Sequence, residues 1–215
     1  HIRDFFIRAR LEDGLDKGVV EVDLENTDNN MEICAVLETP DHKILDKVNT
    51  NTGKLRFTAD TPVLWNAEQP RLYQLILDTG EEQIVQKFGF RKIEIIDSVV
   101  YLNKVPVKMH GVNHHDSDPV TGFVMDREQA LKDLALMKQH NINAIRTSHY
   151  PSSPWLMEMC DELGFYVLDE ADLESHGSAE FYGGSCEKTY GDIVQNPIFY
   201  EAVQDRVRRC IQRDK

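Results

Sequence analysis

The N-terminal part of the chain, up to about Asp97, alternates apolar and polar side chains with a period of two. Val20, Val22 and Leu24 are separated by acidic residues, and the pattern returns at 33–37. This period predicts strands with one buried and one wet face. Further strands are predicted over 5–11, 54–58, 73–77 and 83–95. Short alternating strands without helical stretches between them favour an immunoglobulin-like β-sandwich.

The pattern changes from Val99 onward, where short apolar runs alternate with helical spacing. Runs at 99–102 and 105–109 are followed by a helix that begins at Asp126. The Asp126 carboxylate is predicted to cap it, with Gln129 reaching back to complete a capping box. The buried face of this helix is predicted to carry Ala130, Leu134 and Met137.

A second helix is predicted between two further apolar strands, at 141–145 and 165–168. Ser153 is suited to the N-cap, Pro154 to the first helical position, and Gly164 to the end of the helix. Its buried side is predicted to carry Trp155, Met159 and Leu163. The run at 165–168 is apolar throughout, which is typical of a parallel strand covered on both faces.

A last helix is predicted to begin at 196–197. Its apolar stripe comprises Phe199, Val203, Val207 and Cys210. Three alternations of strand and helix are the beginning of either a β/α barrel or a doubly wound sheet. The sequence therefore predicts an all-β domain followed by an α/β domain.

The net charge of −13 disfavours some classes of binding partner. Such a surface repels phosphate backbones and anionic membranes, whereas a neutral ligand such as a sugar is compatible with it. The sequence shows no secretory signal and no apolar run long enough to cross a bilayer. The four cysteines have no CxxC spacing, so we expect reduced thiols in a cytoplasmic protein rather than disulfides or a zinc site.

Functional side chains gather immediately after the three predicted parallel strands, at 111–116, 146–151 and 169–177. Ligands of β/α folds bind at the carboxyl ends of the strands. Four of the eight histidines fall on these three loops, which predicts a site there. The chain lacks GxGxxG, Walker, GxSxG and HExxH motifs, which disfavours nucleotide chemistry and serine hydrolysis.

Each loop also has a purely structural interpretation. Spacing alone favours solvated loop residues for His114 and His115, and Arg146 with His149 is also explained as a structural ion pair at the barrel mouth. The acidic pair at 169–170 is suited to orienting Arg146 or anchoring loop amides.

Glu174 and His176 form an isolated Glu-x-His pair on the third loop. In an extended chain, residues two apart point the same way, so these two side chains are suited to clasping one cation. The bare pair is a weak metal signal by itself.

The three loops resemble segments of glycoside hydrolase family 2. The matching segments are 110–116 (His-Gly-Val-Asn-His-His-Asp), 146–151 (Arg-Thr-Ser-His-Tyr-Pro) and 169–177 (Asp-Glu-Ala-Asp-Leu-Glu-Ser-His-Gly). Segments 64–73 and 88–91 extend the resemblance upstream, so that it covers nearly the whole chain. Relatives commonly carry Arg-His-Glu where this chain has His-His-Asp at 114–116. The resemblance implies an immunoglobulin-like sandwich over 1–97, followed over 98–215 by an incomplete (β/α)8 TIM barrel with its first three βα units.

The third loop is similar to that of the bacterial β-galactosidases within this family. The resemblance then implies that Glu174 and His176 are ligands of an active-site Mg²⁺. His115 and His149 match the histidines that contact the galactosyl group and favour its transition state. Arg146 matches the arginine that supports the nucleophile carboxylate.

The chemistry implied by the resemblance is retaining hydrolysis of terminal β-D-galactosides of the lactose type by two glutamates. In relatives the acid/base glutamate lies on the fourth barrel strand and the nucleophile further on. The chain therefore contains neither catalytic glutamate, and we expect it to be inactive unless complemented. Alternatives are a non-catalytic binding or structural module, and another family 2 specificity such as β-glucuronidase.

Three parallel strands of an eight-stranded barrel leave an open sheet edge and an uncovered apolar face. Both features favour association with another chain. We therefore expect this chain to self-associate, to be disordered in its barrel part, or both. Separately, the full-length enzyme is expected to be a homo-oligomer.

Overall fold

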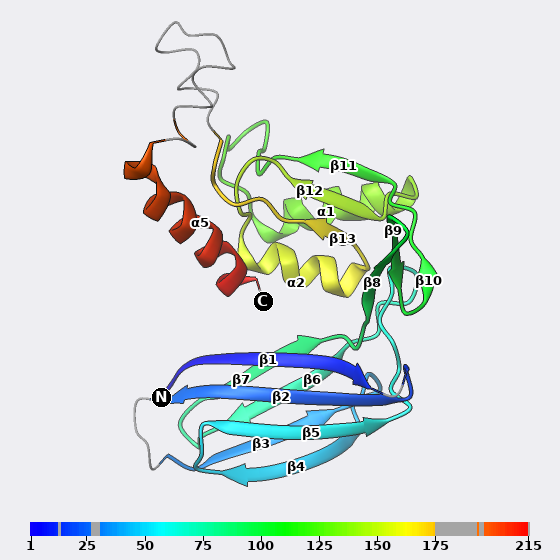
Figure 1. Cartoon of the computed structure of the whole chain (residues 1–215), viewed down its shortest axis with the longest axis vertical. Coiled ribbons are helices and arrows are strands. Elements are labelled where there is room, and N and C mark those ends of the chain that lie inside the picture. The colour runs from blue at the N-terminus through cyan, green and yellow to red at the C-terminus, as the bar shows by residue number, and fades with distance from the viewer. Residues whose placement is uncertain (13, 27–30, 175–192, 194–195, 215) are drawn as a thin grey trace, which may run out of the picture. The chain divides into compact units, whose positions relative to one another are not determined.

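The computed structural model describes residues 1–12, 14–26, 31–174, 193 and 196–214 (Figure 1). The chain divides into two compact units. The first comprises His1–Lys108 with Asp161–Gly164, and the second Met109–Cys160 with Phe165–Lys215.

The first unit contains a sandwich of two antiparallel sheets (Figure 1). One sheet has the order β1-β2-β5, formed by Ile2–Glu12, Lys17–Asn26 and Lys54–Asp60. The other has the order β4-β3-β6-β7, formed by Ile44–Thr50, Ile33–Glu38, Tyr73–Asp78 and Gln83–Phe88. Three strands facing four is the arrangement of an immunoglobulin-like sandwich, as the alternating pattern predicts.

The core of the sandwich follows directly from the period of two. In β3 and β6 every second side chain is buried, and in β2 Val20 and Val22 face the same interior. Phe57 and Phe90 are the largest side chains enclosed there. Because side chains alternate between faces, a shift of one residue in register would expose this whole set.

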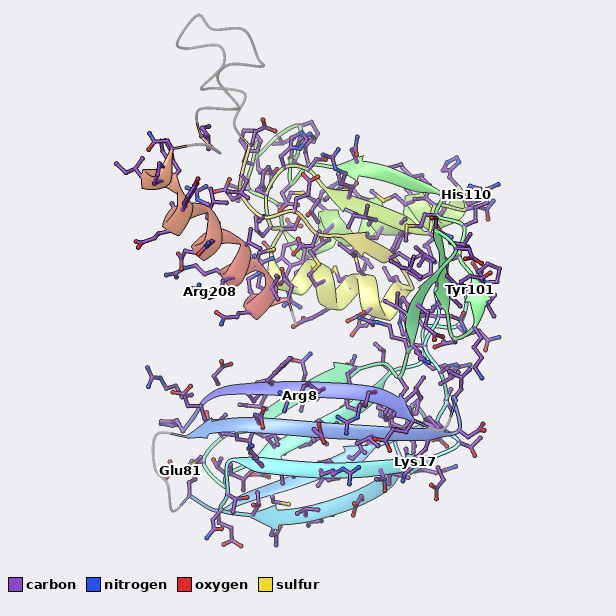
Figure 2. All side chains as sticks on the ribbon, viewed as in Figure 1. Arg8, Lys17, Glu81, Tyr101, His110 and Arg208 are labelled. Carbon is purple, nitrogen blue, oxygen red and sulfur yellow. The ribbon has the colours of Figure 1, made fainter. Side chains whose placement is uncertain are left out.

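The outer face of the β1–β2–β5 sheet is charged, as the polar half of the alternation predicts. Arg8 projects from this face (Figure 2) and lies 2.5 Å from the Asp23 carboxylate on the next strand. Arg10 makes a similar cross-strand pair with Glu21. Such exposed pairs contribute little stability, about 0–1 kcal/mol each, so the apolar inner face carries the fold.

Two features of the first unit differ from the predicted strands. β4 was not predicted, because its residues are almost all exposed and show no alternation. The single strand predicted over 83–95 is instead two strands, because the chain leaves β7 after Phe88. β8 (Ile93–Ile96) begins a separate three-stranded sheet with β9 (Val99–Leu102) and β10 (Val105–Pro106).

The second unit is built on a parallel sheet of β11 (Gly111–His114), β12 (Ala144–Thr147) and β13 (Tyr166–Leu168). The strands are connected by α1 (Arg127–Gln139) and α2 (Pro154–Leu163). Each strand pairs with the next one in sequence. This order is that of a β/α barrel, whereas a doubly wound sheet reverses direction at a switch point.

The start of α1 confirms one predicted contact and corrects another. Asp126 caps the helix, and its carboxylate accepts the N–H of Gln129 at 2.8 Å. The Gln129 side chain does not return to the cap but donates to Asp133 at 2.9 Å. A side-chain acceptor one turn further along the helix therefore replaces the capping box.

The predicted apolar stripe of α2 was wrong by one position. Leu156 and Cys160 are the buried residues, whereas Trp155, Met159 and Leu163 are only partly buried. The Trp155 ring lies under the guanidinium of Arg127, 5.8 Å from the ring centroid. An indole keeps its polar edge near water and its ring against a cation, so this position at the rim suits it.

The last helix, α5 (Tyr200–Arg213), follows the 3-10 turn η1 (Pro197–Phe199), which Asn196 caps. Of its predicted stripe only Cys210 is buried, whereas Phe199 and Val207 are exposed. Within the described residues, hydrogen bonds join α5 to the β13 loop, including one from Arg206 to Asp172. No helix in the described ranges is both long enough and apolar enough to cross a bilayer.

Candidate functional site

The predicted site residues lie at or beyond the ends of the three parallel strands. The first of these strands, β11, was wrongly placed at 105–109 and lies instead within the segment predicted as the first loop, 111–116. The register pairs Asn113 with Arg146, and Arg146 with Leu168. Because the strands run in the same direction, the loops that follow them begin at one edge of the sheet. His115 and His149 follow the first two strands at this edge.

Glu170 lies at the centre of this edge, since its carboxylate contacts two predicted site residues. One oxygen accepts the Nε–H of Arg146, and the other lies 3.1 Å from Nδ1 of His149. The bond from Arg146, with His149 adding to it, lowers the pKa of Glu170, so the carboxylate is ionised at neutral pH. Arg146 also lies 3.2 Å from the Asn113 side-chain oxygen, which fixes the other side of the guanidinium.

His149 brings the remaining described residues of the predicted set together. Its Nδ1 lies 3.7 Å from a carboxylate oxygen of Glu174. Its ring meets that of His115 edge-on, with centroids 5.8 Å apart and planes at 73°. His115, Arg146, His149 and Glu174 therefore converge, and His176 lies outside the described residues. The side chains of Arg146, His149 and Glu174 are 36–39% exposed, which leaves them accessible to a ligand.

His114, in contrast to its neighbour His115, is a buried residue. The solvated-loop interpretation of this side chain was wrong, because it is only 7% exposed. Its Nε2 lies 3.3 Å from Oδ1 of Asp116 but has no aligned hydrogen bond among the described residues. Asp116 also accepts the hydroxyl of Ser152 at 3.1 Å.

We expect Asp116→Asn to lower the free energy of unfolding at pH 7 by about 1–3 kcal/mol, because it removes the charge beside a buried imidazole. The pKa of Asp116 is lowered by His114 first and by Ser152 as well. A lowered pKa adds stability above the unfolded value of about 3.9, and this is lost as the pH falls through the folded value.

Urea denaturation at several pH values checks this prediction. The difference between wild type and variant should shrink as the pH falls below about 4. Asp97→Asn, in the exposed β8–β9 turn, is the control and should stay within about 0.5 kcal/mol of wild type. Equal stability of Asp116→Asn and wild type at pH 7 would contradict the prediction.

Thr147 anchors the third loop beneath the site. Its buried hydroxyl accepts the N–H of Glu170 at 2.9 Å and lies 3.1 Å from a carboxylate oxygen of Asp169. A hydroxyl has one proton to donate and lone pairs to accept, so both bonds form together. The backbone at Glu170 is therefore held to the neighbouring strand.

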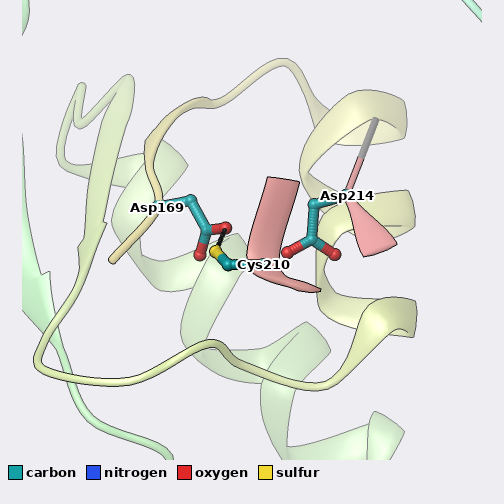
Figure 3. Close-up of side chains that lie close together, drawn as sticks. All are labelled: Asp169, Cys210 and Asp214. Atoms are coloured by element: carbon teal, nitrogen blue, oxygen red, sulfur yellow. Dashed lines mark hydrogen bonds between the residues drawn. The ribbon is translucent and has the colours of Figure 1, made fainter. Parts of the chain in front are cut away.

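Sequence reasoning missed a cluster of Asp169, Cys210 and Asp214, whose possible ligand atoms all lie within 4.8 Å of one another (Figure 3). The Cys210 sulfur lies 2.8 Å from Asp169. Burial, with Asp169 beside it, raises the pKa of Cys210 to about 12, so the thiol is protonated and donates to the carboxylate. The cluster therefore ties α5 to the β13 loop, and the position of Cys210 on the predicted apolar stripe of the last helix was the sequence signal available for it.

Family models match both parts of the chain. Residues 1–91 match the model described as glycosyl hydrolases family 2, and residues 93–215 match that of the family 2 TIM barrel domain. The chain belongs to glycosyl hydrolases family 2. The predicted fold is confirmed, and this family 2 chain is an immunoglobulin-like sandwich followed by the start of a TIM barrel.

Two curated relatives of this family 2 chain carry the name β-galactosidase. The protein of Actinobacillus pleuropneumoniae is 40% identical, and the match covers 100% of this chain and 23% of that protein. The protein of Staphylococcus xylosus is 37% identical over 98% of this chain and 21% of its own length. The chain thus spans less than a quarter of these relatives.

Among solved structures, the similar proteins include β-glucuronidases. β-Glucuronidase 3 of Bacteroides uniformis has a TM-score of 0.74 at 24% identity, over 79% of this chain and 22% of that one. The β-glucuronidase of Dictyoglomus thermophilum has a TM-score of 0.69 at 25% identity, over 79% of this chain and 29% of that one. These similarities support the family 2 fold and leave the sugar specificity open.

Proposed function

We propose that the protein to which this chain belongs is a retaining β-galactosidase that hydrolyses terminal β-D-galactosides of the lactose type. The observation that carries the proposal is the convergence of His115, Arg146, His149 and Glu174 at one edge of the sheet. The names of the 37–40% identical relatives support the galactosyl specificity.

The two histidines are proposed to bind the sugar. Imidazole nitrogens both donate and accept hydrogen bonds, and the two rings meet edge-on at the accessible side of the strand ends. In this arrangement they offer hydrogen bonds to neighbouring hydroxyls of one galactosyl ring. Such bonds favour catalysis where they strengthen as the ring flattens toward its oxocarbenium-like transition state.

Arg146 is proposed to orient the nucleophile carboxylate. Its guanidinium is held by Glu170 and Asn113 and remains 38% exposed. Arginine presents donors in a fork that matches a carboxylate, so the accessible part of the group suits this role. Both catalytic glutamates of the retaining mechanism are proposed to lie beyond residue 215.

Glu174 with His176 is proposed to hold Mg²⁺. A carboxylate oxygen is the ligand this ion prefers, and Mg²⁺ commonly takes one or two carboxylates with water completing its shell. The exposed Glu174 carboxylate fits that chemistry. When bound, the ion would supply a fixed positive charge beside the sugar site.

We expect Glu174→Gln to weaken Mg²⁺ binding by about 10–100-fold, because the amide keeps the shape of the ligand but loses its charge. Isothermal titration of the full-length protein with MgCl₂ measures the change. Asp172→Asn, two residues earlier on the same loop and paired with Arg206, is the matched control and should bind as wild type does. Equal Mg²⁺ affinities for Glu174→Gln and wild type would show that Glu174 is not a ligand of the ion.

The test of the sugar specificity is a comparison of two substrates. β-Glucuronidase is the second candidate, since the similar solved structures carry that name. We expect the full-length protein to hydrolyse nitrophenyl β-galactoside with a kcat/KM at least about tenfold above that for the β-glucuronide. The reverse preference would replace the proposal by the second candidate.

A cytoplasmic location is proposed as well. Cys34, Cys160 and Cys210 are free thiols, which persist in a reducing compartment. Fractionation of the source cells tests this location, and recovery in the medium would contradict it.

The chain by itself is proposed to self-associate, and the full-length enzyme to be a homo-oligomer. In the described part of the second unit, β11 and β13 are the outer strands of an unclosed sheet. Leu131 and Leu136 of α1 are 47% and 55% exposed. Unpaired strand edges and apolar side chains both favour association. We expect light scattering of the purified chain to report a mass above its 24.8 kDa, and a stable monomer would contradict this.

A further inference from the structure

The carboxylate of Glu170 serves two functional side chains at once. One oxygen accepts the Nε–H of Arg146, and the other faces Nδ1 of His149 at 3.1 Å. Both oxygens of the carboxylate are thus engaged by residues of the site, and its 28% exposure leaves it less accessible than either partner.

The surroundings of His149 determine which ring nitrogen carries the proton. Nδ1 faces Glu170 at 3.1 Å, Glu174 at 3.7 Å and one guanidinium nitrogen of Arg146 at 3.3 Å. The nearest of these neighbours is the Glu170 oxygen, which can only accept a hydrogen bond. The tautomer that matches this geometry carries its proton on Nδ1 and donates it to Glu170, which leaves Nε2 as an acceptor nitrogen.

The backbone of Glu170 is fixed independently of its side chain. Its N–H is bound by the buried hydroxyl of Thr147, which also bonds to Asp169. Because the backbone of Glu170 is fixed, its carboxylate stays in one place and restricts the orientations of Arg146 and His149. A preorganised site needs functional side chains that are restricted in this way.

We propose that Glu170 is a positioning residue, which sets the ring tautomer and orientation of His149 and the direction of the Arg146 guanidinium together. His149 then presents Nε2 as an acceptor for a sugar hydroxyl, and Arg146 presents its remaining donors to a carboxylate. The kinetic consequence rests on the proposed β-galactosidase function, whereas the contacts themselves do not.

The test is a double-mutant cycle in the full-length protein with Glu170→Gln and His149→Phe. Gln keeps the size of the side chain but replaces one acceptor oxygen by a donor, so it can satisfy only one of its two partners. We expect Glu170→Gln alone to reduce kcat/KM for nitrophenyl β-galactoside by about 10–100-fold. In the His149→Phe background, Glu170→Gln should reduce kcat/KM by a much smaller factor, because the imidazole that Glu170 positions is already absent. Glu158→Gln, an exposed residue of α2, is the control and should leave kcat/KM unchanged.

A second readout separates this proposal from the proposed function. The same cycle is measured by urea denaturation, where we expect the two changes in midpoint to be non-additive whether or not the protein hydrolyses galactosides. A wild-type protein without activity would overturn the β-galactosidase function and leave the contact testable. Additive midpoints, or an equal kinetic loss in both backgrounds, would overturn the role of Glu170.

Discussion

The chain by itself is expected to show no turnover of nitrophenyl β-galactoside, whereas the full-length protein is expected to hydrolyse it. Retaining hydrolysis needs a nucleophile and an acid/base carboxyl about 5–5.5 Å apart on either side of the scissile bond. The described carboxylates around the site have other assignments, and Glu174, 3.7 Å from His149, is proposed to hold Mg²⁺. Glu170 binds Arg146 and His149, Asp116 pairs with His114, and Asp169 accepts the Cys210 thiol.

The assay compares the purified chain with the full-length protein at equal concentration and with a buffer blank. The control for folding of the chain is its circular dichroism, which should show the strand content of the sandwich. Release of nitrophenol in proportion to the concentration of the chain, above the blank, would show that a catalytic pair exists within it.

His149→Phe in the full-length protein is expected to reduce kcat/KM for a β-galactoside by about 10²–10³-fold. Removal of one preorganised hydrogen bond to the transition state has an effect of this size. Phenylalanine keeps a flat ring beside His115 but offers no nitrogen to the sugar, to Glu170 or to Glu174. The loss should fall on kcat as well as on KM, because the bond is proposed to strengthen in the transition state.

The matched control for this variant is His140→Phe. His140 is the exposed C-cap of α1, so it lies before β12 whereas His149 follows it. We expect steady-state kinetics of the control to equal those of wild type. Equal kinetics for His149→Phe would exclude this histidine from the sugar site.

Much of the fold could be predicted because its signals are local. The alternation in β2 and β3 and the Asp126 cap each depend on neighbours within one strand or turn. β4 was not predicted because most of its side chains are exposed, so its sequence does not alternate between apolar and polar residues. The buried face of α2 was predicted one position too early because Trp155 is apolar and was assigned to the core. In the structure its ring lies at the rim beside Arg127.

The position of the site was predictable for a topological reason. Parallel strands end at one edge, so loops that are distant in sequence meet there, and His115, Arg146 and His149 do so. The two-sided role of Glu170 was harder to predict, because orienting Arg146 was only one of several interpretations of an acidic strand end. The contact between Asp169 and Cys210 joins residues 41 apart, with no periodic signal linking them.

The most direct test of the account is a crystal structure of the full-length protein with a galactose-configured inhibitor and Mg²⁺. The proposed site predicts sugar hydroxyls within about 3.2 Å of ring nitrogens of both His115 and His149, and the ion on Glu174 and His176. An inhibitor that binds elsewhere, or that touches neither histidine, would contradict the assignment of this edge as the galactoside site.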